Sequence, residues 1–285
     1  LSGNNFSGVL PADLARLPDL QSLDLSANAF SGAIPDGFFG HCRNLRDVSL
    51  ANNAFSGDVP RDVGACATLA SLNLSSNRLA GALPSDIWSL NALRTLDLSG
   101  NAITGDLPVG VSRMFNLRSL NLRSNRLAGS LPDDIGDCPL LRAVDLGSNN
   151  ISGNLPESLR RLSTCTYLDL SSNALTGNVP TWVGEMASLE TLDLSGNKFS
   201  GEIPGSIGGL RLVKERWLAG NGCTGGVPES IGGCKSLVHV DVSWNSLTGT
   251  LPSWVFASGV QWVSVSDITL SGEVFVPVNA SSMVR

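Results

Sequence analysis

The sequence has very little histidine, few charges and no long apolar segment, and each shortage narrows the classes of function. His41 and His239 are the only histidines, so general-base catalysis and histidine-rich metal sites have few candidate residues. Charged residues make up 15% of the chain and the formal net charge is −6, which argues against a nucleic-acid partner. No apolar run approaches the roughly 18 residues that a membrane span needs. Apolar residues nonetheless reach 42%, so we expect a globular chain with a sizeable core.

A repeat runs through almost the whole sequence. The string Leu-x-Leu-Ser-x-Asn recurs, and each asparagine is followed by an apolar residue and then by Ser/Thr/Ala-Gly-x-apolar-Pro. The interval is 24 residues, except 25 between Asn28 and Asn53. Such a period predicts a solenoid of stacked coils, in which each coil buries its apolar face only against its neighbours. We number the coils by their asparagines, from one to eleven: Asn4, Asn28, Asn53, Asn77, Asn101, Asn125, Asn149, Asn173, Asn197, Asn221 and Asn245.

Coil nine shows how the pattern translates into structure. Residues 191–195 alternate, which predicts a short strand with Leu192 and Leu194 inward and Asp193 outward. Asn197 then turns inward, where its amide can bond backbone groups of its own coil and of the neighbouring coil. Leaving such buried groups unpaired costs about 1–3 kcal/mol each. Stacked coils place equivalent strands about 4.8 Å apart in a parallel sheet.

The consensus Leu-x-x-Leu-x-x-Leu-x-Leu-Ser-x-Asn-x-Phe-Ser-Gly-x-Ile-Pro resembles the plant-specific class of leucine-rich repeats over residues 1–275. The chain is similar to the extracellular domains of plant receptor-like kinases, including the group with inactive kinases. Similar repeats occur in receptor-like proteins and in polygalacturonase-inhibiting proteins. The resemblance implies an α/β solenoid, a right-handed superhelix of about twelve 24-residue coils with a parallel β-sheet on its concave face. It also implies secretion, N-glycosylation and a recognition role.

These observations predict the organisation and function of the chain. We expect one solenoid domain over residues 1–275, cut inside the repeat array at both ends, and a further repeat or a frayed tail over 276–285. The predicted function is binding of an extracellular peptide or protein on the concave face of coils six to eleven, with a shorter leucine-rich repeat co-receptor as a second partner. We expect no catalysis and no cofactor in this chain; any kinase domain lies outside it. The alternative is a secreted inhibitor of a microbial enzyme that degrades cell walls.

The cysteines favour buried free thiols over disulfides. Four of them share one slot that apolar residues fill in other coils, and the other two take consensus Leu and Phe slots. A buried free cysteine behaves as a small apolar residue. A bridge between the cysteines of adjacent coils is the less favoured alternative. The shared slot holds Cys42, Cys66, Cys138 and Cys234, and the consensus slots hold Cys165 and Cys223.

The outward columns of the concave strands supply the candidate binding residues. Early coils carry small polar residues there, whereas aromatic residues concentrate in the later coils. Exposed aromatic residues beside carboxylates suit the anchoring of a peptide. The alternative is that the column holds family-consensus Asp and Ser residues with incidental aromatic ones. The candidates are Tyr167, Asp169, Thr191, Asp193, Glu215, Trp217, His239 and Asp241.

A basic patch adds a second hypothesis. Arg94, Arg118 and Arg142 occupy one slot in three consecutive coils, with Arg123 close by. Like charges on neighbouring strands repel each other, and acidic residues of the next column, such as Asp145, can compensate in part. The sharper hypothesis is a socket in which Arg118, Arg123 and Arg142 hold a ligand carboxylate or sulfate.

Coil ten departs from the pattern, because Arg216 stands where leucine belongs. An unpaired buried charge is costly, so we expect this strand to shift or Arg216 to reach its edge. Trp217 could then turn inward and leave the candidate surface.

Four Asn-x-Ser sequons predict glycosylation sites if the chain is secreted. Asn5 and Asn150 directly follow ladder asparagines and should be exposed on one flank. Asn73 is the central outward residue of its strand, where a glycan would obstruct the concave face of the early coils. The fourth sequon is Asn279.

Overall fold

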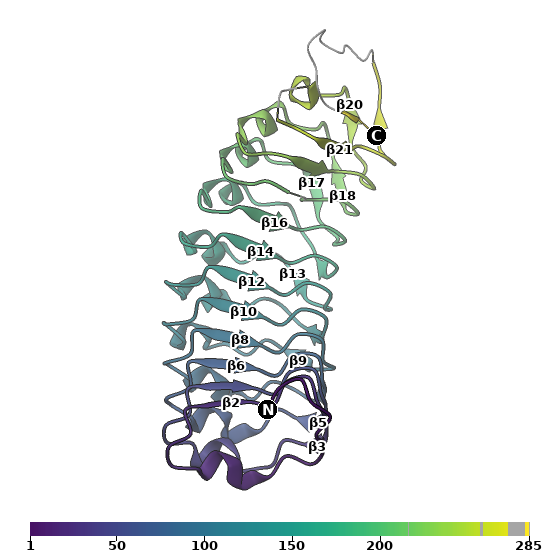
Figure 1. Ribbon diagram of the computed structural model, residues 1–285. Helices are drawn as coiled ribbons and strands as arrows, with labels where there is room; N and C mark the ends of the chain where they lie inside the picture. Colours follow the sequence, from purple (N-terminus) through teal and green to yellow (C-terminus); the bar gives the residue numbers. More distant parts are fainter. Residues whose placement is uncertain (216, 257–258, 273–282, 285) are drawn as a thin grey trace.

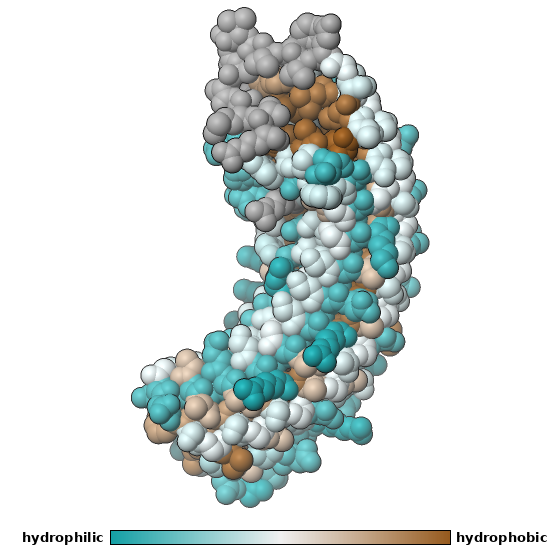
Figure 2. Space-filling model, turned by 90° about the vertical axis from the view of Figure 1, so that its right-hand side faces the viewer, coloured by the Kyte–Doolittle hydropathy of each residue, from teal (hydrophilic) through white to brown (hydrophobic). Residues whose placement is uncertain are grey.

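A computed structural model describes residues 1–215, 217–256, 259–272 and 283–284, and within them the coils stack into one curved array (Figure 1). The N-terminus lies at one end of the stack and the C-terminus at the other. Figure 2 shows the array bent into an arc, with a flank that is mostly hydrophilic or neutral and apolar atoms gathered near its C-terminal end. This is the solenoid that the 24-residue period predicts.

An eight-stranded parallel sheet forms the main face of coils two to nine. Its strands pair in register one period apart, so that Leu96 lies opposite Leu120 and Leu120 opposite Val144. The inward apolar residues are buried, and their neighbours on each side are at least partly exposed in every strand except β14, in which Asp169 is buried. The strands are β2 (Ser22–Asp24), β4 (Asp47–Ser49), β6 (Ser71–Asn73), β8 (Thr95–Asp97), β10 (Ser119–Asn121), β12 (Ala143–Asp145), β14 (Tyr167–Asp169) and β16 (Thr191–Asp193).

The sheet is interrupted at coil ten. Beyond β16 the pairing continues as an isolated parallel bridge between Thr191 and Glu215, and a regular sheet resumes with β19 (His239–Asp241), β21 (Trp262–Ser264) and β23 (Met283–Val284). Trp217 is fully buried in the core. The expectation that it turns inward is confirmed, and its assignment to the ligand-binding surface is wrong. Coil ten lacks the usual apolar residue at position 216, and Trp217 supplies apolar volume to the core instead; Arg216 itself lies outside the described residues.

A second set of short parallel strands follows the ladder asparagines. Phe6, Phe30 and Phe55 stack along this side, with ring centroids 6.3 and 6.1 Å apart. Phe30 and Phe55 are buried in this stack, whereas Phe6 in the first coil stays 44% exposed. The strands are β1 (Ser7–Gly8), β3 (Ala29–Ala33), β5 (Ala54–Asp58), β7 (Arg78–Ala80), β9 (Thr104–Asp106), β11 (Arg126–Ala128), β13 (Ser152–Gly153), β15 (Ala174–Leu175), β17 (Ser200–Glu202), β18 (Gly222–Thr224), β20 (Thr248–Gly249) and β22 (Thr269–Leu270).

The chain returns on the convex side through short 3-10 helices, most of which follow the repeated proline. Proline has no N–H to donate but its carbonyl accepts the first bond of the turn, as Pro204 does from the Ile207 N–H at 3.0 Å. The helices are η1 (Ala12–Arg16), η2 (Phe39–His41), η3 (Arg61–Ala65), η4 (Ser85–Ser89), η5 (Val111–Arg113), η6 (Asp133–Asp137), η7 (Glu157–Arg161), η8 (Thr181–Glu185), η9 (Gly205–Gly209), η10 (Glu229–Gly233) and η11 (Ser253–Phe256).

The asparagine ladder joins each coil to the one before it. In coil six, Asn125 Nδ2 donates to the carbonyls of Leu122 in its own coil and Leu98 in the preceding coil, both at 3.0 Å. Its Oδ1 accepts from the Ile103 N–H of the preceding coil at 3.0 Å. The same bonds recur from Asn53 to Asn245. The prediction that these amides face inward and tie neighbouring coils together is confirmed.

Two cysteines form a disulfide, so the prediction of free thiols is wrong at these positions. Cys42 and Cys66 directly follow η2 and η3 in adjacent coils, where their Cα atoms lie 5.6 Å apart and the sulfurs are bonded. This separation lies within the range that a disulfide spans. The bridge exists because both residues fill one slot in consecutive coils.

The other four cysteines are free and buried, as expected. Burial raises the pKa of the Cys138 and Cys165 thiols to about 12. It raises the pKa of Cys223 and Cys234 to about 11. These thiols therefore stay protonated at neutral pH and act as apolar packing groups.

Candidate ligand-binding surface

The last residues of the concave strands form one column, which we call the middle column. Its acidic members stabilise the turn that follows each strand. Asp193 Oδ1 accepts from the Ser195 N–H at 2.9 Å and from the Ser195 hydroxyl, which fixes the turn that follows the strand. In coil two the hydroxyl and N–H of Ser26 lower the pKa of Asp24 in the same way. The Asp-Leu-Ser consensus thus stabilises the turn. This favours the alternative in which much of this column holds family-consensus residues that do not contact a ligand. The same pairing joins Asn73 to Ser75, Asp97 to Ser99, Asp169 to Ser171 and Asp241 to Ser243.

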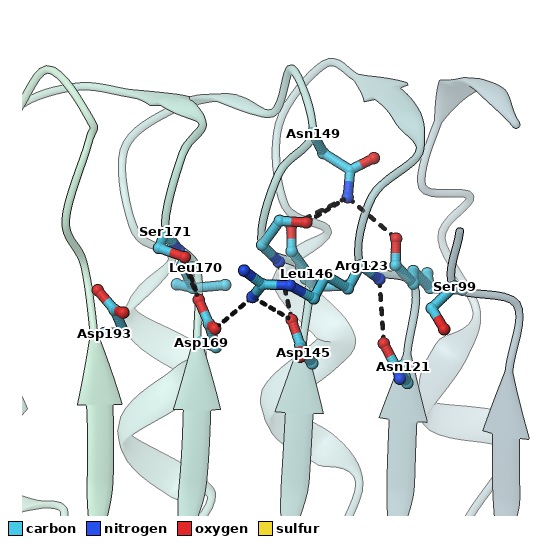
Figure 3. Close-up of polar contacts among 12 residues, drawn as sticks. Ser99, Asn121, Arg123, Asp145, Leu146, Asn149, Asp169, Leu170, Ser171 and Asp193 are labelled. Atoms are coloured by element: carbon cyan, nitrogen blue, oxygen red, sulfur yellow. Dashed lines mark hydrogen bonds and ion pairs between the residues drawn. The ribbon is translucent and has the colours of Figure 1, made fainter. Parts of the chain in front are cut away.

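Arg123 crosses the concave face instead of standing open to a ligand. Its Nη1 lies 2.6 Å from Asp169 Oδ2, two coils away, and 3.5 Å from Asp145 Oδ1 (Figure 3). Tyr167 donates its hydroxyl to the same Asp169 oxygen at 3.4 Å. Asp169 is 5% exposed, so the expectation that it faces the solvent is wrong. Arg123 already pairs with two carboxylates of this chain, so it is not free to hold a ligand anion as the predicted socket requires.

Gly147 leaves room for this crossing. It occupies the consensus serine slot of coil seven, and Arg123 occupies that slot in coil six. A Cβ at Gly147 would lie 2.6 Å from Arg123 Nη1 and 2.9 Å from Asp169 Oδ1. The bulky residue and the missing side chain are therefore complementary substitutions in adjacent coils.

Burial and charge shift the pKa values of this network. Burial raises the pKa of Asp145, and the charge of Asp169 adds to the increase. Burial would lower the pKa of Arg123, but the charges of Asp169 and Asp145 outweigh that effect and raise it. Burial and both carboxylates raise the pKa of Tyr167 to about 12. The tyrosine is therefore neutral at physiological pH and Arg123 stays charged.

Replacing Arg123 with glutamine should lower the free energy of unfolding by about 1–2 kcal/mol at pH 7, because it leaves the buried Asp169 without its cation. Since folding raises the pKa of Asp145 above 3.8, its carboxylate destabilises the fold as pH rises through that range, and Arg123 offsets this. The loss should therefore shrink from pH 7 to pH 4 in urea unfolding curves.

The control is Arg161→Gln, which removes an exposed pair with Asp137 at 2.7 Å. It should cost less than about 0.5 kcal/mol at either pH. An equal effect of both substitutions at pH 7 would show that the Arg123 network is an ordinary surface pair.

In the later coils, several candidate residues lie side by side in one column on the concave face. Tyr167 pairs with Thr191, Thr191 with Glu215, and His239 with Trp262. His239 Nδ1 lies 3.4 Å from Glu215 Oε1, and its ring meets that of Trp262 edge-on with centroids 6.4 Å apart. We call these residues the late column: Tyr167, Thr191, Glu215, His239 and Trp262. Trp262 is the next residue of the column after the predicted candidates.

Other predicted residues lie where the pattern placed them. Arg118 and Arg142 are exposed just before β10 and β12. Asp193 and Asp241 are partly exposed, each bonded to its turn. Their role in ligand binding stays a prediction.

Three of the four sequons fall on described residues. Asn5 and Asn150 are exposed. Asn73 is partly exposed and its Oδ1 accepts from Ser75. Asn279 lies outside the described residues, and glycosylation stays a prediction at all four positions.

Sequence reasoning missed one conspicuous surface residue. Trp244 is 63% exposed and has φ = 54°, a left-handed conformation that is costly for a bulky residue. It stands in the variable slot of Ser-x-Asn, where the two preceding coils carry Gly196 and Gly220. The size of the residue in that slot was the available signal.

Within the described part of the chain, no group of three or more His, Cys, Asp or Glu residues is placed to hold a metal ion. Among the same residues, no helix has the length and apolar character needed to cross a membrane.

The stacked coils, parallel sheet and inward asparagines define a leucine-rich repeat solenoid. Leucine-rich repeat family profiles match residues 67–127 and 139–199, and also 19–41 and 236–257. The chain belongs to the leucine-rich repeat family. The leucine-rich repeat receptor-like protein kinase PXC2 of Arabidopsis thaliana is 51% identical over 49 residues, which are 17% of this chain and 5% of that protein.

Solved receptor structures match the fold over most of its length. The plant peptide hormone receptor RGFR1 in complex with RGF2 gives a TM-score of 0.88 at 30% identity, covering 95% of this chain and 47% of that one. The Arabidopsis receptor kinase HAESA, in complex with the peptide hormone IDA and the co-receptor SERK1, gives 0.88 at 34% identity, with coverage of 95% and 45%. The chain thus spans less than half of each of these two receptor chains. These similarities identify a plant leucine-rich repeat receptor-like ectodomain.

Proposed function

We propose that this chain is the extracellular recognition part of a plant receptor-like kinase, and that it binds a peptide or protein along the late column. The observation that carries the proposal is the late column itself, in which Glu215, His239 and Trp262 present ionisable and aromatic side chains on neighbouring coils. The acidic residues of the middle column are hydrogen-bonded to the turns that follow them, whereas the late column presents side chains that can contact a ligand. Aromatic residues beside charges are typical anchors in interfaces.

The similar receptor structures support the same proposal. Both were solved with peptide hormones, and one also contains a co-receptor. By analogy, a shorter leucine-rich repeat co-receptor would be the second partner, and the kinase activity of the whole protein would lie outside this chain. The recognition step itself needs no catalysis: specificity comes from the side chains that successive coils present together.

A tagged synthetic peptide library, screened by pull-down, tests the proposal. We expect Glu215→Arg and His239→Ala each to weaken the binding of captured peptides by about tenfold, since each removes a contact on the late column. The matched control is Asp47→Arg, which makes a comparable charge change at the corresponding column position of coil three.

The control should leave binding within about twofold of the parent chain. Peptides that bind both late-column variants as tightly as the parent would contradict the proposed surface.

A further inference from the structure

The residues that directly precede the concave strands form a column along the N-terminal ends of the strands. We call its part in coils five to seven the arginine edge. In coils five to seven this column holds Arg94, Arg118 and Arg142, kept in register by the pairing of β8, β10 and β12. All three are exposed. None of the ion pairs found among the described residues involves them. In a chain with a net charge of −6, this is a local positive strip.

The same column in coils nine and ten shows how close neighbouring side chains come. Lys214 Nζ lies 2.8 Å from Glu190 Oε2, so opposite charges in this slot neutralise each other directly. The three arginines instead face like charges on strands about 4.8 Å apart, which repel each other. A ligand that supplies anions between them would relieve this repulsion.

The neighbouring acids of the middle column do not supply those anions. Asp97 Oδ1 accepts from Ser99, and Asp145 Oδ1 accepts from the Gly147 N–H and lies beside Arg123. Asp145 was expected to compensate the arginine column, but its ion pair is with Arg123.

Two exposed apolar residues lie in the turns that lead into these strands. Phe115 is 52% exposed and precedes Arg118 by three residues; Leu140 is 40% exposed and precedes Arg142 by two. Coil eight carries Ser163 and Thr164 in the corresponding slots, so the fold does not require apolar residues there.

We infer that this edge, formed by Arg94, Arg118, Arg142, Phe115 and Leu140, binds an extended acidic peptide segment that carries an apolar side chain. Alternate side chains of an extended peptide lie about 6.6 Å apart, so two carboxylates can sit over the row of three arginines. Guanidinium groups bind carboxylates in a bidentate manner, and Phe115 and Leu140 offer contact to the apolar residue. The inference rests on the proposed recognition role, but not on the late column.

The test is fluorescence polarisation with a labelled peptide that has three alternating glutamates and one phenylalanine. Arg94→Gln/Arg118→Gln/Arg142→Gln should weaken binding at least about tenfold. The control, Arg43→Gln/Arg61→Gln/Arg211→Gln, removes equal charge from exposed arginines elsewhere and should change binding less than about twofold. Phe115→Ser/Leu140→Ser should weaken the phenylalanine peptide about threefold and leave its alanine analogue unaffected. Circular dichroism checks that each variant folds.

Three results would overturn the inference: no binding of the glutamate peptide, equal losses in the two triple variants, or a sulfated polysaccharide that binds through the arginines without any effect of Phe115 and Leu140. If one of these results is found but Glu215→Arg still weakens the binding of library peptides, the edge site is rejected and the proposed function stands. Loss of Glu215 dependence alone would reject the late column and leave the edge site intact.

Discussion

Replacing Asn197 with alanine should lower the free energy of unfolding by about 3–5 kcal/mol, because one amide satisfies several buried backbone groups at once. Asn197 is 8% exposed. Its Nδ2 donates to the Leu170 carbonyl of the preceding coil at 3.0 Å and to Leu194 of its own coil at 3.1 Å. Its Oδ1 accepts from the Leu175 N–H at 3.0 Å. Alanine would leave these groups unpaired between two coils, where water has little access.

The measurement is urea unfolding followed by circular dichroism, with Asn116→Ala as control. Asn116 makes one exposed bond to the Asn91 carbonyl at 2.8 Å and should cost less than about 0.5 kcal/mol when replaced. Because solenoid stability depends on contacts between neighbouring coils, the Asn197 variant should also unfold in two phases as its halves uncouple. Equal effects of the two substitutions would mean that the ladder contributes no more than surface hydrogen bonds.

Replacing Gly208 with alanine should lower the free energy of unfolding by about 3 kcal/mol, because a Cβ there has no room. Gly208 lies in η9, and an added Cβ would collide with the backbone carbonyl of Ser230 in the next coil. A backbone atom cannot move aside as a flexible side chain can, so the convex side of these two coils would have to separate.

Gly205→Ala in the same helix provides the matched control. The nearest atom to its added Cβ is Ser230 Oγ at 3.8 Å, an ordinary contact, so this change should be neutral or stabilising by about 0.5 kcal/mol. Thermal unfolding of the two variants side by side decides the point. If both alanines lower the melting temperature equally, close packing of neighbouring convex helices is not what Gly208 provides.

The sequence determined the repeat unit and the inward asparagines because both depend on a local pattern that recurs every coil. It was also sufficient to expect that coil ten breaks the pattern and that Trp217 could turn inward. It did not predict the crossing of Arg123 to Asp169, which are 46 residues apart. That contact depends on how far a long side chain reaches over neighbouring coils and on the space that Gly147 leaves.

The disulfide was misjudged for a related reason. Cys42 and Cys66 were assigned to an apolar slot, and that assignment fits all four cysteines of the slot. A bridge between adjacent coils was the less favoured alternative from the sequence, and the stacking shows that Cys42 and Cys66 do meet, with Cα atoms 5.6 Å apart. The occupancy of one slot in consecutive coils is the sequence signal for this disulfide.

The candidate surface was predictable in outline but not residue by residue. The outward columns follow from strand alternation, and most of their members are at least partly exposed as expected. Asp169 differs because a carboxylate beside Arg123 and Tyr167 is covered by them. Which column residues are available to a ligand therefore depends on contacts between coils, and the late column and the arginine edge are what remain.

Hydrogen exchange of asparagine side-chain amides, followed by NMR, tests the central claim most directly. The claim is that the asparagines of coils two to eleven turn inward to join neighbouring coils, as Asn125, Asn173 and Asn197 do. We expect their side-chain amide protons to exchange about a hundredfold more slowly than those of the exposed Asn5 and Asn150. Equal exchange rates in the two groups would contradict the account.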